Sequence, residues 1–264
     1  MNQLSQLTDP QKNELDTFIK SKPRWYHGWQ ITDDIRLPGG VDVQERCDIY
    51  GIPESLAGAK VLDIGAQSGG FSLEFERRGA QVTAIDTCEP DLYGFATLRR
   101  ILNSKIDFRQ MNVYDIDQVF SKEYFDYVLF SGVFYHLRHP LLVLDKIRFV
   151  VKQTVWVESF VIDNAFVVNG KRKKLPHKLK NASILQFYRK DELSEDPTNW
   201  FGPTAHCLNE ILWSCGFESE FRGYDKSGHR GHFTAKKMAG TPEHERIVTN
   251  SKIIKEYGVK HYIG

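Results

Sequence analysis

The sequence predicts an α/β protein whose mostly parallel sheet is covered by helices on both faces. Two observations carry this prediction. Between about residues 60 and 161, apolar segments of strand length alternate with amphipathic segments of helix length. The first of these strands ends in a glycine-rich turn at residues 65–70, and the second ends in an acid, Asp86. A strand, a glycine turn, a helix and a second strand with a terminal acid are typical of a nucleoside-binding site.

The individual elements follow from the same pattern. The expected strands cover 60–64, 81–86, 106–111, 125–130 and 154–161, and the expected helices cover 69–78, 91–103, 116–120, 140–150 and 205–215. Segments 217–223 and 231–237 flank a turn and predict a hairpin. Ahead of the first strand we expect an amphipathic helix within 1–20, a loop at 37–40 and a helix at 41–49.

These elements divide the chain into three expected parts. Residues 1–55 form an N-terminal helical and aromatic cap, and residues 56–240 form the main domain. Residues 162–204 are an insertion after the fifth strand, because the repeating strand–helix pattern does not need them. Residues 241–264 are expected to form a peripheral C-terminal helix and tail.

Composition narrows the class of protein. The chain has 264 residues and a formal net charge of +1, so overall charge does not drive it toward nucleic acid or membranes. No segment approaches the roughly 20 apolar residues of a membrane span, and the polar N-terminus lacks the apolar core of a leader peptide. Four scattered cysteines and no apparent leader predict a cytoplasmic protein with reduced thiols. No spacing of His, Asp and Glu predicts a metal site, and oligomeric state is not readable.

The glycine turn favours one nucleoside cofactor over another. A dinucleotide site usually has three glycines, but Gln67 stands where the middle one would be, between Gly65 and Gly70. Asp63, two residues before the turn, would repel a pyrophosphate and could instead reach an ammonium group. Asp86 could accept hydrogen bonds from ribose hydroxyls. S-adenosylmethionine carries both an ammonium group and a ribose, so the residues favour it over NAD.

The motifs VLDIGAQSGGFS, AIDT and FDYVLFSGVFYHLRHP resemble those of class I S-adenosylmethionine-dependent methyltransferases. More narrowly, the chain from about Gly51 to Phe217 is similar to the tRNA wobble-uridine 5-oxyacetic acid methyl- and carboxymethyltransferases. This resemblance implies a Rossmann-like, seven-stranded sheet whose last strand is antiparallel. The carboxymethylating members carry Trp and Lys where this chain has residues 41–46, VDVQER. Ordinary S-adenosylmethionine is therefore expected, since a carboxylated cofactor would need cationic partners.

We expect cofactor contacts from the ends of the first four strands. The residues are Asp63, Gly65, Gln67, Ser68, Asp86, Thr87, Asn112, Val113, Ser131 and Gly132. Asn112 and Val113 are included because the resemblance implies that residues there line the adenine. Asp115 could contact the adenine amine or cap the helix at 116–120, and the sequence does not decide between the two.

Catalytic candidates follow the fourth and fifth strands. His136 is the first choice as a general base and His27 the second, with Tyr135 and Glu158 as supporting groups. Arg138 and His139 are expected to be structural. Glu158 lies in an apolar strand, so its charge must be paired or face a cleft.

The expected reaction is methyl transfer to an oxygen or nitrogen of a small-molecule acceptor. Three tryptophans, Trp25, Trp29 and Trp200, could form an acceptor wall or simply fill the core. The alternative is modification of tRNA, because residues 171–190 contain eight Lys or Arg and no Asp or Glu. A third reading is a non-catalytic binding protein on the same fold.

Overall fold

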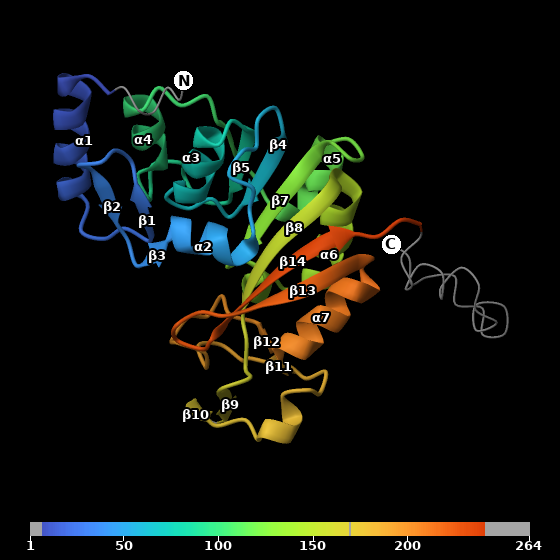
Figure 1. Cartoon of the computed structure of the whole chain (residues 1–264). Helices are drawn as coiled ribbons and strands as arrows, with labels where there is room; N and C mark the ends of the chain where they lie inside the picture. Colours follow the sequence, from blue (N-terminus) through green and yellow to red (C-terminus); the bar gives the residue numbers. More distant parts are fainter. Residues whose placement is uncertain (1–6, 169, 241–264) are drawn as a thin grey trace.

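The computed structural model describes residues 7–168 and 170–240, and its centre is a seven-stranded sheet in the order β13-β14-β8-β7-β4-β5-β6 (Figure 1). The strands of this sheet are β4 (Lys60–Ile64), β5 (Gln81–Asp86), β6 (Asp107–Gln110), β7 (Phe125–Ser131), β8 (Val151–Phe160), β13 (Phe217–Tyr224) and β14 (Arg230–Lys237). The first five run parallel, whereas β14 is antiparallel to both β8 and β13. The predicted fold class is therefore confirmed.

The strand order fixes where a ligand can bind. From β4 the chain moves outward through β5 to β6, then returns to place β7 on the other side of β4. The strand order thus reverses between β4 and β7, and open α/β sheets bind ligands outside the carboxyl ends of strands at such a point. Asp63 pairs in register with Leu129, and Ile64 with Phe130. The glycine turn after β4 and Ser131 at the end of β7 therefore share one edge of the sheet.

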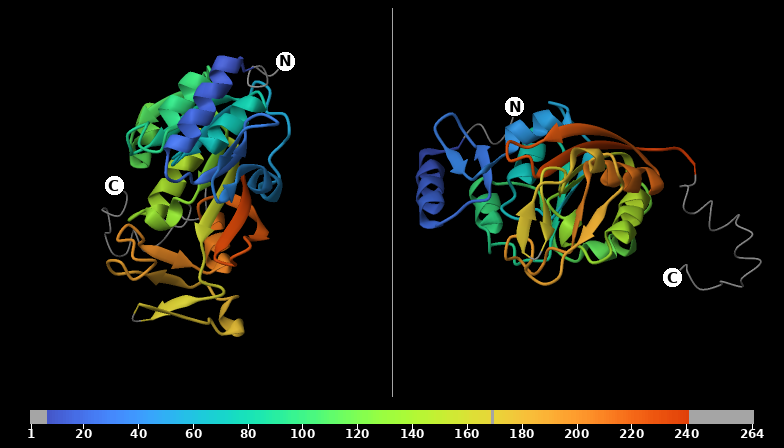
Figure 2. Two further views of the ribbon diagram at one scale, coloured as in Figure 1. Left: turned by 90° about the vertical axis from the view of Figure 1, so that its left-hand side faces the viewer. Right: turned by 90° about the horizontal axis from the view of Figure 1, so that it is seen from below.

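Helices cover the sheet in two layers (Figures 1 and 2). One face carries α1 (Asp9–Ser21), α2 (Val43–Tyr50), α3 (Gly70–Arg77) and α4 (Phe95–Ile101), and the other carries α5 (Ile116–Val119), α6 (Pro140–Val150) and α7 (Ala205–Ser214). Each layer buries its own apolar cluster against the sheet. None of the helices in the described ranges is long and apolar enough to cross a membrane.

Helix α4 is shorter than expected. Its predicted range was 91–103, but the helix begins at Phe95 because Gly94 adopts a left-handed conformation with a φ of 85°. A Cβ at Gly94 would lie 2.9 Å from the Trp25 ring, so this position has room only for glycine. Residues 91–94, which come directly before the helix, form turns instead.

The N-terminal segment adds a small sheet to the α1–α4 layer. Its strands are β1 (His27–Gln30), β2 (Arg36–Pro38) and β3 (Val41–Asp42), in the order β2-β1-β3. The expected loop at 37–40 is thus wrong at its start: Leu37 is fully buried and pairs with Trp29. Trp25 and Trp29 are 5 % and 1 % exposed, so both fill the core, and Trp29 is no acceptor wall.

The insertion after β8 builds a small subdomain beyond the carboxyl end of that strand (Figure 1). It contains β9 (Phe166–Val168), β10 (Lys171–Lys173), the 3-10 turn η4 (His177–Leu179), β11 (Leu185–Phe187) and β12 (Phe201–Pro203). The amide of Ile162 donates to the carbonyl of Pro203, which joins the two ends of the insertion at 2.9 Å. The division of the chain at residue 55 stays a prediction, and the expected C-terminal helix at 241–264 lies outside the described residues.

Candidate active site

The turn after β4 depends on backbone conformations that favour glycine. Gly65 and Gly69 both have a φ of 76°, and Gln67 between them has a φ of 50°. A Cβ on Gly65 would lie 2.7 Å from Cγ2 of Val133, so any side chain there would collide with the segment after β7. The turn is tied to β5, because the amides of Gly65 and Ala66 donate to the carbonyl of Ile85. Residues 65–70 therefore bring bare backbone to the switch point of the sheet.

Asp86 closes β5 beside this turn. Its carboxylate accepts hydrogen bonds from the amides of Gln67 and Cys88, each at 2.9 Å. Each carboxylate oxygen keeps further acceptor capacity, and the side chain is half-buried. Asp86 can thus hold the turn and still accept bonds from two hydroxyl groups. Thr87 beside it is exposed, and its carbonyl accepts from the Gln110 side chain at 3.1 Å.

His27 lies beneath the turn rather than in open solvent. Its Nδ1 accepts a bond from the Gly70 amide at 3.2 Å and lies 3.0 Å from the Ser68 hydroxyl. Gly70 is the first residue of α3, so the imidazole takes the place of a helix-capping side chain. Burial lowers the pKa of His27 to about 3, so the ring is neutral at physiological pH. This geometry gives His27 a part in shaping the turn, and the buried Ser68 hydroxyl shares its Nδ1.

Asp63 is also buried, at 2 % exposure. Its Oδ2 accepts a hydrogen bond from the Ser72 hydroxyl in α3 at 2.5 Å. Burial, opposed by the hydrogen bonds from Ser72 and aided by the nearby charge of Asp86, raises its pKa to about 7. No cation of the described chain pairs with this carboxyl group.

The predicted adenine-side residues follow β6. Asn112 is exposed, and its side chain accepts from the Tyr114 amide at 3.1 Å, while Val113 is buried. Asp115 precedes α5, but its side chain makes no capping hydrogen bond, and it is exposed. The capping alternative for Asp115 is therefore wrong, and its contact with a ligand stays a prediction.

A second group of polar side chains gathers at the ends of β7 and β8. We call it the glutamate cluster, and it consists of Tyr50, Ser131, Tyr135, Glu158 and Arg230. Glu158 Oε1 accepts from Arg230 at 3.1 Å, and its Oε2 accepts from Ser131 at 3.4 Å. Tyr50 lies 2.9 Å from the Ser131 hydroxyl, and Arg230 also contacts the Tyr135 hydroxyl. Glu158 was expected either to be paired or to face a cleft, and the structure shows the pair, with Arg230 as the partner.

Gly132 leaves open space next to this cluster. Its φ is 73°, and a Cβ there would lie 3.7 Å from Glu158 Oε2 and 3.8 Å from the Tyr135 hydroxyl. Those two oxygen atoms therefore border the backbone that follows β7. Burial, then the charge of Glu158, raises the pKa of Tyr135, which keeps its phenol protonated.

His136 is next in the chain, but it faces the insertion. Its Nδ1 lies 2.8 Å from the Thr198 hydroxyl, and its ring centroid is 4.2 Å from that of Tyr135. The amide of Trp200 donates to the carbonyl of Tyr135 at 2.7 Å, so the insertion is fastened to this segment. The guanidinium of Arg138 lies over Trp200 and Phe187, at 5.0 and 5.3 Å from the ring centroids. Arg138 thus packs on Trp200. The His139 amide donates a hydrogen bond to the Tyr114 hydroxyl at 2.9 Å, and the two ring centroids lie 6.2 Å apart.

Sequence reasoning missed two members of the glutamate cluster. Tyr50 comes from α2 and Arg230 from the start of β14. A signal for Arg230 was present, because polar residues alternate at 230, 232 and 234 along a strand of the expected hairpin. The register that places His232 opposite Glu158 required the tertiary structure.

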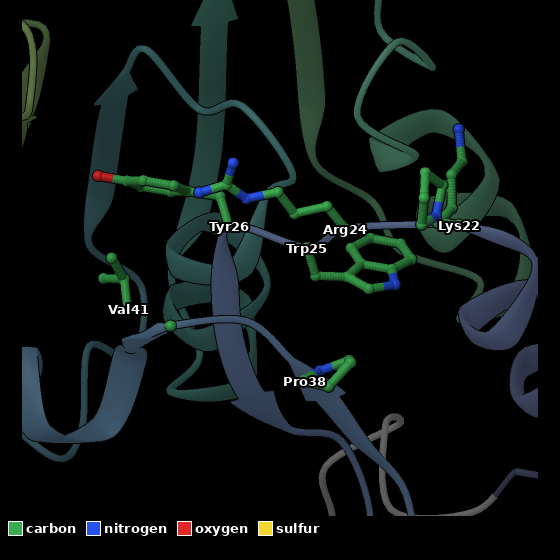
Figure 3. Close-up of a pocket in the computed structure, with 8 residues that line it drawn as sticks. Lys22, Arg24, Trp25, Tyr26, Pro38 and Val41 are labelled. Atoms are coloured by element: carbon green, nitrogen blue, oxygen red, sulfur yellow. The ribbon is translucent and has the colours of Figure 1, made fainter. Parts of the chain in front are cut away.

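A cleft of about 450 Å³ opens beside Tyr26 (Figure 3). It is lined by Lys22, Pro23, Arg24, Trp25, Tyr26, Pro38, Gly40 and Val41. Arg24 extends toward the Tyr26 ring, and Lys22 lies at the opposite end. Burial, then the charge of Glu158, raises the pKa of Tyr26. The residue is 39 % exposed, and its ring packs edge-on against that of His27 at 5.1 Å between centroids.

The polar groups at the switch point match those of a cofactor that contains an adenosine and an amino-acid group. Asp86 offers paired acceptors, the glycine turn offers bare backbone, and Asp63 offers a buried carboxyl group without a cation. No group of three or more His, Cys, Asp and Glu side chains in the described ranges has the geometry of a metal site.

This fold and this edge of the sheet define the class I S-adenosylmethionine-dependent methyltransferase fold. Residues 49–199 match a family model described as a methyltransferase domain. The match covers more than half of the chain, so the protein belongs to this methyltransferase family. Membership supports S-adenosylmethionine as cofactor and methyl transfer as the class of reaction.

Curated relatives divide between two kinds of acceptor. Ubiquinone biosynthesis O-methyltransferase of Xanthomonas campestris pv. campestris is 32 % identical over 144 residues, which are 53 % of this chain and 57 % of the relative. The tRNA U34 carboxymethyltransferase of Aliivibrio salmonicida is 25 % identical over 221 residues, which are 81 % of this chain and 61 % of the relative. The matched part therefore spans little more than half the length of these relatives.

A solved structure supports the fold. The 1,6-didemethyltoxoflavin-N1-methyltransferase of Burkholderia thailandensis, with bound 1,6-didemethyltoxoflavin and S-adenosylhomocysteine, superposes with a TM-score of 0.53. It is 21 % identical, and the match covers 75 % of this chain and 80 % of that one. At this identity the similarity concerns architecture and not the acceptor.

Proposed function

We propose that the protein transfers a methyl group from S-adenosylmethionine to an oxygen or nitrogen of a small-molecule acceptor. The observation that carries the proposal is the position of Asp86, the 65–70 turn and the glutamate cluster around one switch point. The turn and Asp86 would bind the cofactor, and the glutamate cluster would bind the acceptor on the opposite side of the transferred methyl group. The site is thus divided into two halves that meet between β4 and β7.

On the cofactor side, Asp86 would accept hydrogen bonds from the ribose hydroxyls, and Asp63 would face the ammonium group. Gly65, Gln67, Ser68 and Thr87 would surround the amino-acid end and ribose, and Asn112 and Val113 the adenine. Ser131 and Gly132 would border the reacting end. When bound, the cofactor supplies an electrophilic methyl group on a sulfonium.

On the acceptor side, this chain has to orient a nucleophile, exclude water and receive a proton. Glu158 is already engaged by Arg230 and Ser131, which suits it to orienting hydroxyl groups. Tyr135 keeps its proton and can donate a hydrogen bond. His136 has a lowered pKa, chiefly because of burial, and is the first candidate for receiving the proton. His27 is bonded to the turn through Nδ1 and fits a supporting role better than that of a base.

A small acceptor is favoured by the cleft beside Tyr26, whose volume of about 450 Å³ falls in the range of small-molecule sites. The relatives named for ubiquinone biosynthesis point the same way. Lys22 and Arg24 at the cleft would favour an acceptor with a negatively charged group.

Modification of a tRNA is the second candidate, because the insertion exposes an unneutralised basic surface. Residues 171–174 and Lys178 are exposed cations, and none has a carboxylate partner among the described residues. The tRNA-modifying relative extends over most of this chain. If that candidate used a carboxylated cofactor, the added carboxylate would have to compete with Glu158 for Arg230.

Calorimetric titration separates these candidates. The protein is titrated in parallel with S-adenosylmethionine, S-adenosylhomocysteine and the carboxylated analogue of S-adenosylmethionine. Tight binding of the first two with weaker binding of the analogue is expected from the main proposal. Preference for the analogue would move the protein to the carboxymethylating candidate, and absence of binding by all three would leave a non-catalytic role.

A further inference from the structure

The segment that ends the insertion makes an ordered chain of hydrogen bonds to His136. Asp196 Oδ1 accepts from the Thr198 amide at 2.9 Å and from the Thr198 hydroxyl at 2.6 Å. The same Thr198 oxygen lies 2.8 Å from His136 Nδ1. Residues of the insertion are thus connected through one hydroxyl group to the imidazole that follows β7.

The direction of the proton in each bond can be assigned. A threonine hydroxyl has a single hydrogen. The Thr198 hydroxyl oxygen and the Asp196 carboxylate oxygen are only 2.6 Å apart, so a proton must lie between them. A hydrogen bond to a carboxylate is also stronger than one between neutral groups. The Thr198 hydrogen therefore points to Asp196, and Thr198 can only accept from His136. Nδ1 of His136 must then carry the imidazole hydrogen.

The opposite nitrogen is consequently an acceptor. In a neutral imidazole with its hydrogen on Nδ1, the lone pair lies on Nε2. No hydrogen bond to Nε2 of His136 occurs within the described part of the chain. The charged and titratable groups around the ring are Asp196 from the insertion, Arg230 from β14 and the neighbouring Tyr135. Burial and Arg230 lower the pKa of His136, whereas Asp196 raises it.

We propose that Thr198, held by Asp196, is a positioning residue that keeps His136 in the tautomer whose Nε2 receives the acceptor's proton. This inference rests on the proposed methyl transfer. In that step the acceptor oxygen or nitrogen forms a bond to the methyl carbon, and the carbon–sulfur bond breaks with its electron pair remaining on sulfur. The proton lost by the acceptor passes to Nε2 and later to solvent.

The role of the insertion follows from this arrangement. The Trp200 amide holds the carbonyl of Tyr135, and Thr198 holds the side chain of the next residue. The insertion thereby fixes both the backbone and the imidazole of the segment after β7. Covering the site would not require the hydrogen bond between Thr198 and the His136 side chain.

The test is the tautomer of His136 measured by long-range proton–nitrogen NMR, with His136→Gln used to assign its signals. The wild-type protein should show the hydrogen on Nδ1, and Thr198→Val, which keeps the shape but removes the hydroxyl, should shift the ring toward the Nε2–H form. Thr198→Ser should restore the wild-type spectrum. Ser194→Ala, an exposed hydroxyl of the same insertion, is the matched control and should leave it unchanged.

Kinetics with a catechol probe, 3,4-dihydroxybenzoate, give a second readout. Thr198→Val should lower kcat by about tenfold or more with little change in the KM for S-adenosylmethionine, and Thr198→Ser should recover most of it. A wild-type spectrum with hydrogen on Nε2, an unchanged spectrum in Thr198→Val, or full turnover by His136→Gln would each overturn the inference. If wild-type protein does not bind S-adenosylmethionine, the proposed function is wrong. If it binds the cofactor but does not methylate the probe, catechols are excluded as acceptors. The spectra still decide whether Thr198 positions His136.

Discussion

His27 and Gly70 are separated by 43 residues in sequence, yet Nδ1 of His27 accepts the Gly70 amide at 3.2 Å. The N-terminal segment thereby supplies the acceptor that the first turn of α3 lacks, because Gly69 has no side chain to cap the helix. The cofactor turn and the cap segment are joined at this bond. A residue expected as a possible base is thus placed where it can order the turn.

This bond predicts different outcomes for two substitutions of His27. His27→Asn places a carbonyl oxygen near the position of Nδ1 and should retain most turnover, whereas His27→Ala should lose about 1–3 kcal/mol of stability and bind S-adenosylmethionine more weakly. Thermal unfolding and calorimetric titration measure both effects. Equal loss of turnover in the two variants, with cofactor affinity intact, would instead make His27 the base.

The lowered pKa of His27 also predicts a pH dependence of stability. The folded-state pKa is about 3 and the ordinary value is 6.5, so the unfolded chain binds the extra proton between them. The contribution of His27 to stability is therefore complete above pH 6.5 and is lost as pH falls toward 3. The difference in Tm between wild type and His27→Asn should change in favour of the variant from about pH 7 to pH 5. A difference independent of pH would contradict a neutral buried imidazole.

Substitution of Asp86 should have the strongest effect on the affinity for the cofactor. Asp86→Ala removes the acceptors for the ribose and the partner of the Gln67 and Cys88 amides, so affinity for S-adenosylhomocysteine should fall by about tenfold or more. Glu89→Gln, at an exposed acid three residues on, serves as the control and should bind normally. Full affinity in Asp86→Ala would remove the cofactor from this edge of the sheet.

Asp63 predicts that cofactor affinity depends on pH. Its pKa is about 7 in the structure, so the carboxyl group is mostly protonated below that pH. An ammonium group placed beside it favours the ionised form, and binding should therefore tighten as pH rises from about 5.5 to 7.5. Asp63→Asn should bind more weakly at the upper end and lose this dependence. Calorimetry across the range decides, and equal slopes in the two proteins would place the ammonium group elsewhere.

The ion pair between Glu158 and Arg230 should contribute more to stability than an exposed ion pair does. Arg222, which pairs with Glu220, provides the comparison. The Arg230 and Arg222 side chains are both 29 % exposed, but their partners Glu158 and Glu220 are 8 % and 68 % exposed. Arg230→Met leaves a buried carboxylate unpaired and should cost about 2–3 kcal/mol, whereas Arg222→Met should cost less than about 1 kcal/mol. Adding Glu158→Gln to Arg230→Met should recover part of the loss. Equal changes in Tm for the two arginine variants would show that Glu158 needs no partner.

Substitutions in the basic segment 171–174 should distinguish a small-molecule acceptor from a tRNA. Replacing Lys171, Arg172 and Lys173 by Gln should leave small-molecule methylation unchanged. If tRNA is the acceptor, the triple variant should bind it less tightly and with a shallower dependence on salt, by up to about three units of slope. Lys105, Lys122 and Lys236, which are exposed elsewhere, form the control triple. Filter binding over a range of salt concentrations, run beside small-molecule turnover, distinguishes the cases.

The alternating strands and helices and the cofactor edge were predictable from sequence because their signals are local, whereas the order of the strands in the sheet came from the structure. Strands β4 and β5 are short apolar runs. The glycine turn directly follows β4 and Asp86 ends β5, so the parallel strands bring these residues to one edge. Boundaries were less predictable where a tertiary contact decided them. Leu37 pairs with Trp29 to form a strand in an expected loop, and Gly94 delays α4 because the Trp25 ring occupies the adjacent space.

The sequence alone determined the class of fold, the glycine turn and the acids at its edge, since each depends on residues that are near one another in the chain. Only the tertiary structure decided that His27 supports the turn, that Arg230 neutralises Glu158 and that Thr198 holds His136. These pairs are separated by 43, 72 and 62 residues. Their hydrogen bonds require a particular packing of the cap, the final hairpin and the insertion around the sheet, and no local pattern in the sequence specifies that packing.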